Sequence, residues 1–170
     1  MTDLLVLAAS HGENLLMAER FAAAARARDR SAEVLDLTEL ALPLFTSRKQ
    51  AEPAPPGLAV LQSRLAGAPR WVICTPEYNG SIPPVLTSAI AWLSVQGEDF
   101  RSLFNQRPIA IASRSGGGGH TVLVALRLQL AHLGAEVVGR QLVSTAATPA
   151  KDSSIDDLVD RLFAHAVPRC

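Results

Sequence analysis

Short apolar runs recur along the chain at intervals that leave room for a helix between them. Residues 4–9, 71–75 and 108–113 are almost continuously apolar, which is typical of strands buried on both faces of a parallel sheet. Residues 32–37 mix apolar and charged positions and predict a less buried strand. A fifth strand is expected at residues 137–138.

The segments between these strands carry apolar residues at helical spacing. Met17 and Phe21 indicate a helix over residues 13–28, residues 58–65 predict another, and an amphipathic stretch ends at residue 94. The two longest apolar stripes are formed by Leu123, Leu126, Leu130 and Leu133, and by Ile155, Leu158, Val159, Leu162 and Phe163.

Proline, glycine and polar residues predict where the elements end. Residues 43–57 are expected to be irregular, because the three prolines between residues 53 and 56 exclude helix. Gly134 is expected to stop the helix before the fifth strand. Asp152 or Ser153 is the expected cap of the last helix.

Five strands alternating with helices predict an α/β fold with a doubly wound parallel sheet. Alternation alone permits either a flavodoxin-like or a Rossmann strand order. No repeat or linker divides the chain, so residues 1–170 are expected to form a single domain.

Composition narrows the class of protein. Apolar residues make up 48% of the chain and charged residues 19%, as in globular proteins. Sixteen basic and sixteen acidic residues cancel, which gives no general attraction to nucleic acid or to an anionic membrane. Two cysteines, no signal-peptide pattern and no long apolar run predict a cytoplasmic protein.

Residues 75–86 form the most distinctive segment, a polar loop between an apolar strand and a helix. In α/β proteins such loops build ligand sites at the carboxyl ends of strands. Residues 76–83 read Pro-Glu-Tyr-Asn-Gly-Ser-Ile-Pro, which resembles the signature of the NADPH-dependent FMN reductase family of flavin, quinone, azo-dye and chromate reductases. The agreement continues at Leu86, Ala89, Ile90, Trp92, Leu93 and Ser94.

The resemblance implies a flavodoxin-like, three-layer α/β/α fold whose five-stranded parallel sheet has the order 2-1-3-4-5. This order brings together loop one (residues 10–14), loop two (residues 76–83) and loop three (residues 113–120) at one edge of the sheet. Loop one would hold the phosphate of FMN, and loops two and three the flavin ring. The expected cofactor contacts are Ser10, Asn14, Leu15, Pro76, Glu77, Tyr78, Asn79, Gly80, Ser81, Ser113, Ser115, Gly116 and Gly117.

The physical character of the loops agrees with these roles. Backbone amides at a helix start bind phosphate, and Ser10 and Asn14 add polar side chains there. Tyr78 and the flat peptides of loop two suit an aromatic ring system. The glycines of loop three have no Cβ to keep a ligand away.

The family resemblance implies hydride transfer from NADPH or NADH through FMN to a small acceptor. Backbone groups of Asn79 and Gly80 are expected at the N5 edge of the flavin, and no side chain is assigned as an acid or base. No metal site is expected, because His11 and His120 lie singly in their loops and no Cys/His cluster has metal spacing. Family members are usually homodimers or homotetramers, and residues 43–57 and 94–107 are expected interface elements.

Loop one departs from the family pattern. It is short, it contains no arginine, and Glu13 places a carboxylate beside the expected phosphate. Two alternatives therefore stay open: a flavodoxin-like electron carrier, and a family relative that has lost tight FMN binding and acts as a binding module. Zero net charge argues against the carrier, since such carriers are normally acidic.

Overall fold

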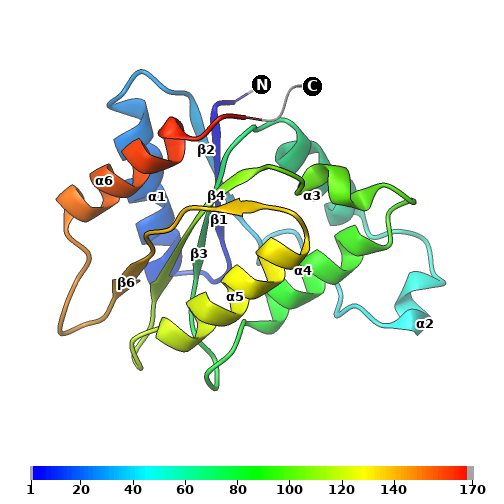
Figure 1. The fold of residues 1–170 in the computed structure, drawn as a ribbon. Coiled ribbons are helices and arrows are strands. Elements are labelled where there is room, and N and C mark those ends of the chain that lie inside the picture. The colour runs from blue at the N-terminus through cyan, green and yellow to red at the C-terminus, as the bar shows by residue number, and fades with distance from the viewer. Residues whose placement is uncertain (1, 168–170) are drawn as a thin grey trace.

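A parallel sheet forms the centre of the molecule, with helices on both of its faces (Figure 1). The structure is a computed structural model and describes residues 2–167. In chain order the elements are β1 (Leu4–Ala8), α1 (Glu13–Arg26), β2 (Ala32–Asp36), α2 (Ser47–Gln50), α3 (Pro56–Ala66), β3 (Trp71–Thr75), α4 (Pro84–Ser94), the 3-10 helix η1 (Phe100–Leu103), β4 (Pro108–Arg114), α5 (His120–His132), β5 (Glu136–Val137), β6 (Leu142–Ser144) and α6 (Asp152–Ala164).

The strand order is β2-β1-β3-β4-β5, and all pairs are parallel. This confirms the flavodoxin-like order. The fifth position of the sheet is split, which the sequence did not predict. β5 pairs with the beginning of β4, where Pro108 faces Glu136, and β6 pairs with its end, where Arg114 faces Ser144.

The pleat of the strands divides the core into two layers. Leu4 and Val6 of β1 face the side covered by α1 and α6. Leu5 and Leu7 face the opposite side, covered by α3, α4 and α5. Burial on both faces explains why the central strands have nearly continuous apolar sequences.

The structure corrects two predictions about helices. Residues 43–57 are not free of helix: α2 forms where the Thr46 hydroxyl accepts a hydrogen bond from Lys49 N at 3.1 Å, and α3 starts at Pro56, because a first-turn proline needs no amide partner. Neither Asp152 nor Ser153 caps α6. Its N-cap is Lys151, which makes no side-chain capping bond.

The end of α5 follows the sequence prediction. Gly134 follows Leu133, the C-cap of α5, and adopts a φ of 97°, as expected for a helix stop. Trp71, Cys74 and Trp92 are buried. Among residues 2–167, no helix is both long and apolar enough to cross a bilayer.

Candidate cofactor site

Loops one, two and three lie together at the carboxyl edge of the sheet, at the bottom of Figure 1. Two sets of contacts join them. The Asn14 side chain bonds to the backbone of Arg114, and Glu77 N donates to Ser115 Oγ at 3.3 Å. Residues far apart in sequence thus form one rim.

Loop two is closed by a tight turn. Tyr78 N donates to Ser81 O at 3.1 Å, and Ser81 N donates to Tyr78 O at 3.0 Å. Asn79 and Gly80 between them have φ values of 52° and 70°. Positive φ at both central positions defines a type I′ turn, for which Asn-Gly is the preferred sequence.

An open hollow of about 690 Å³ lies beside this turn. It is lined by Glu77, Tyr78, Asn79, Ser81, Ile82 and Pro84. The Tyr78 residue is 50% exposed, so its ring is accessible to a flat ligand. Of the predicted loop-two contacts, Pro76 is the one that lies buried.

The Glu77 carboxylate has a structural partner. Its Oε2 accepts a hydrogen bond from Val122 N at 3.0 Å, in the first turn of α5. A carboxylate at a helix N-terminus satisfies an unpaired amide and complements the helix dipole. The side chain of Glu77 therefore ties loop two to α5, while its backbone contacts Ser115.

Loop three presents backbone on the rim and polar groups beneath it. Gly116 and Gly117 are exposed, and a Cβ added at Gly116 would meet nothing within 4 Å. Ser113 is fully buried, and its hydroxyl has no hydrogen-bond partner among the described residues. Gly119 has a φ of 81°, and a Cβ there would collide with the Ser113 hydroxyl, so this position requires glycine.

In loop one, the side chain of Asn14 is buried and committed to the protein. Its Nδ2 donates to Arg114 O and its Oδ1 accepts from Arg114 N, both at 3.0 Å. A further bond joins Nδ2 to Ser10 Oγ at 3.3 Å. Leu15 packs against the core layer under α1 and α6. Asn14 thus acts as a clip between α1 and β4.

The backbone amides at the start of α1 are free to bind a ligand. Within the part of the chain that is described, the amides of residues 10–15 donate to no protein acceptor. Gly12, the N-cap, has a φ of 88°, and a Cβ there would meet nothing within 4 Å. Such a group of amides at a helix N-terminus suits a phosphate.

His11 links loop one to β2. Its Nδ1 lies 3.1 Å from Asp36 Oδ2, and its side chain is 76% exposed. Burial raises the pKa of Asp36, but hydrogen bonds from Thr38 and His11 outweigh it and hold that pKa below the ordinary carboxyl value. Thr38 donates both its amide, at 2.8 Å, and its hydroxyl, at 2.7 Å, to Asp36 Oδ1.

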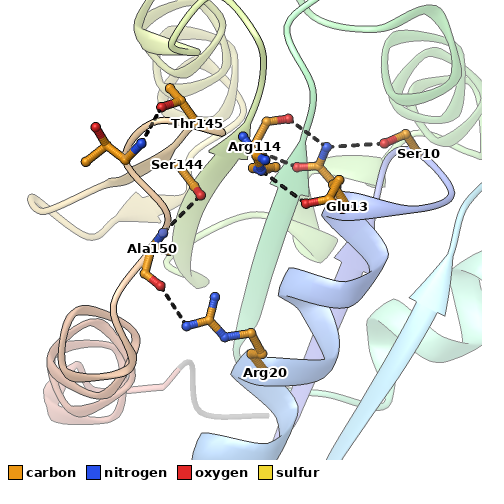
Figure 2. A network of polar contacts seen from close by, with 9 residues as sticks. Ser10, Glu13, Arg20, Arg114, Ser144, Thr145 and Ala150 are labelled. Carbon is orange, nitrogen blue, oxygen red and sulfur yellow. Dashed lines mark hydrogen bonds and ion pairs between the residues drawn. The ribbon is translucent and has the colours of Figure 1, made fainter.

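The structure adds Arg114, which the sequence prediction omitted from the site. Figure 2 shows its guanidinium beside the first turn of α1, where Nε lies 3.2 Å from Glu13 Oε2. Arg114 ends β4, so it reaches loop one from the other side of β3. The sequence could have indicated Arg114 as a site residue, because it lies at the carboxyl end of a predicted central strand, where ligand sites form in α/β proteins.

Comparisons with known proteins agree with this fold. Residues 2–149 match the family described as NADPH-dependent FMN reductase. A search of curated proteins gives no match. Among solved structures, FerB, a flavoenzyme NAD(P)H:(acceptor) oxidoreductase from Paracoccus denitrificans, is 20% identical with a TM-score of 0.74, over 97% of this chain and 99% of FerB.

Two further structures have similar folds. An oxidoreductase from Corynebacterium diphtheriae is 21% identical with a TM-score of 0.71, over 96% of both chains. A flavodoxin from the domain Archaea is 12% identical with a TM-score of 0.64, over 96% of this chain and 95% of the flavodoxin. At these identities the structural matches establish the flavodoxin-like fold.

Proposed function

The chain belongs to the NADPH-dependent FMN reductase family and is therefore an NAD(P)H-dependent oxidoreductase, and from this premise we propose that it transfers hydride from NADPH or NADH through FMN to a small acceptor. The acceptor class comprises quinones, free flavins, azo compounds and metal oxyanions. The observation that carries the proposal is the open hollow beside the Asn79–Gly80 turn, bordered by the exposed ring of Tyr78.

The residues on the rim fit an aromatic cofactor with a phosphate tail. The Asn79–Gly80 turn presents peptide groups for the N5 edge of the ring, and Gly116 and Gly117 allow close approach of backbone. The free amides of residues 10–15 suit the phosphate. Bound FMN supplies the hydride chemistry. The chain supplies position and backbone hydrogen bonds, and we assign no side chain as acid or base.

The proposal is tested on the purified protein. Bound FMN gives absorption in the blue, and NADPH or NADH should be oxidised in the steady state when a quinone is added. Denaturation followed by separation of the released flavin should yield FMN, because the proposed site binds a single phosphate through loop one and the sequence has no dinucleotide-binding motif. Recovery of mainly FAD would contradict the cofactor assignment, and absence of pyridine-nucleotide oxidation would contradict the activity.

A second candidate function is a binding module that has lost tight FMN affinity. The observation that favours it is Glu13, whose carboxylate stands in the first turn of α1, where a phosphate dianion is expected. A protein that stays colourless after incubation with FMN would support the binding module. A protein that takes up FMN but does not turn over NADPH would support the electron carrier.

We also propose that the protein is a homodimer or homotetramer. Val124 and Leu128 of α5 are 63% and 73% exposed and lie one helical turn apart. Leu44, within the proline-rich segment expected at an interface, is 67% exposed. Light scattering of the purified protein measures the oligomeric state.

A further inference from the structure

Loop one brings no arginine or lysine to the phosphate end of the site, and the ring of its histidine, His11, bonds to Asp36. The phosphate of FMN is a dianion, and loop one offers backbone amides, the partial charge of a helix N-terminus and the opposing carboxylate of Glu13. A positively charged group near these amides would offset Glu13. The structure brings the guanidinium of Arg114, from the end of β4, to the Glu13 carboxylate in the first turn of α1.

The backbone of Arg114 is held in place on both sides. Its N–H donates to Asn14 Oδ1 and its carbonyl accepts from Asn14 Nδ2, each at 3.0 Å. Asn14 itself lies in the first turn of α1 and is buried. The attachment point of the Arg114 side chain is therefore fixed relative to the free amides, which lowers the entropy cost of using it in binding.

The guanidinium of Arg114 retains hydrogen-bonding capacity. Nε is engaged by Glu13 Oε2 at 3.2 Å, while the two terminal amino groups make no hydrogen bond to any described residue. The Arg114 side chain is 20% exposed and that of Glu13 66% exposed. A planar pair of amino groups matches two oxygens of a phosphate.

We propose that Arg114 binds the phosphate of FMN through its terminal amino groups, and that Glu13 competes with the phosphate for the same guanidinium. The inference rests on the proposed function, because it concerns the FMN site of that function. Arg114 then determines the preference for FMN over flavins without a phosphate. Glu13 limits that preference, because its carboxylate forms an ion pair with the Arg114 guanidinium in the flavin-free protein.

Arg20, on α1 with Glu13, provides a matched comparison for Arg114. It borders, together with Arg114 and Glu13, a hollow of about 320 Å³. Its guanidinium is already committed: one terminal amino group donates to Asp152 Oδ1 at 2.6 Å and to Ala150 O at 2.8 Å, as Figure 2 shows for Ala150. Removing the Arg20 charge should therefore leave the phosphate contact intact.

The experiment compares FMN with riboflavin, which lacks the phosphate, by fluorescence titration of the flavin-free protein. Arg114→Gln should weaken FMN binding by about tenfold, roughly 1.4 kcal/mol, and leave riboflavin affinity unchanged. Arg20→Gln should change neither affinity. Arg114→Lys keeps the charge without the planar donor pair and should recover part of the lost FMN affinity, and circular dichroism identifies folded variants.

Glu13→Gln tests the competition. It should tighten FMN binding by about two- to fivefold without affecting riboflavin, and this gain should disappear when Arg114→Gln is also present. A gain that persists in the double variant would show that Glu13 acts directly on the phosphate and would overturn the competition.

The outcomes separate this inference from the proposed function. Equal loss of FMN and riboflavin affinity in Arg114→Gln, no loss of either, or an FMN-specific loss of the same size in Arg20→Gln would overturn the role of Arg114 and leave the proposed function standing. Failure of the natural protein to bind either flavin would overturn the proposed function and, with it, the inference.

Discussion

Replacing Gly80 with valine tests whether the loop-two turn borders the flavin ring. Gly80 has a φ of 70°, a conformation that costs a residue with a Cβ roughly 1–2 kcal/mol. The added Cβ would lie 4.0 Å from Thr121 Cγ2, which is an ordinary contact. The variant should therefore fold, with a melting temperature lowered by about 2–4 °C for each kcal/mol lost.

The effect on ligand binding should exceed this loss of stability. Gly80 lies between Asn79 and Ser81, two residues that line the hollow, and a branched side chain at Gly80 would separate a flat ligand from the peptide groups of the turn. We expect the affinity for FMN and for riboflavin to fall alike, by about tenfold or more, equivalent to roughly 1.4 kcal/mol. Equal loss for both flavins identifies the ring end of the site, since the two ligands share the ring.

Gly97 provides the matched control. Its φ is 82°, a Cβ there would meet nothing within 4 Å, and it lies in the connection after α4. Gly97→Val should cost similar stability through backbone strain and leave both flavin affinities unchanged. The role assigned to the loop-two turn would be refuted by a folded Gly80→Val variant with normal flavin affinity, or by an equal loss of affinity in Gly97→Val.

Three further predictions concern contacts around the site and the exposed face of α5. Glu77→Ala should lower the free energy of unfolding by about 1 kcal/mol, because the first turn of α5 loses its acceptor; urea denaturation of this variant and of Glu77→Gln, which keeps an acceptor oxygen, measures the difference. Burial raises the pKa of Asp36, and the hydrogen bonds from Thr38 and His11 together lower it further than burial raises it. Asp36→Asn should therefore cost about 1.5–3 kcal/mol at neutral pH, and the difference should shrink as pH falls below the ordinary carboxyl pKa of about 3.9 and vanish below the folded-state pKa, in urea titrations across that range. Leu128→Glu should shift light-scattering mass toward smaller species if α5 forms the subunit interface, whereas Val60→Glu on α3, also at an exposed position, should not.

Local sequence patterns predicted the elements that bury most of their surface. β3 occupies residues 71–75 as expected. A short, continuously apolar run bounded by polar residues is typical of a strand buried on both faces of a parallel sheet. The sequence pattern did not predict that two short strands, β5 and β6, pair with different parts of β4. β5 and β6 contain two and three residues, too few to show a period, and they form strands because one edge of β4 offers them partners.

The convergence of the three loops was predictable, whereas the partners of their side chains were not. Parallel topology places loops one, two and three on the same edge whatever their sequence. The partners of Asn14 and Glu77 lie 100 and 45 residues away along the chain. Both residues were assigned to the cofactor from the family resemblance. In the structure the Asn14 side chain bonds to Arg114 at the end of β4, and the Glu77 side chain bonds to Val122 in α5. Such bonds depend on the distance between elements, which no local pattern contains.

The short loop one and the position of Arg114 have a common physical basis. Only four residues separate the end of β1 at Ala8 from the start of α1 at Glu13. So short a connection has little room for an arginine or lysine that could reach the phosphate. The first turn of α1 instead lies against the end of β4, where Asn14 bonds to the backbone of Arg114. Under the proposal that Arg114 holds the phosphate, the arginine missing from loop one is supplied by another strand. Arg114 and Glu13 then form one ion pair that accounts for both departures of loop one from the family pattern. The two residues should therefore be altered together when the site is engineered.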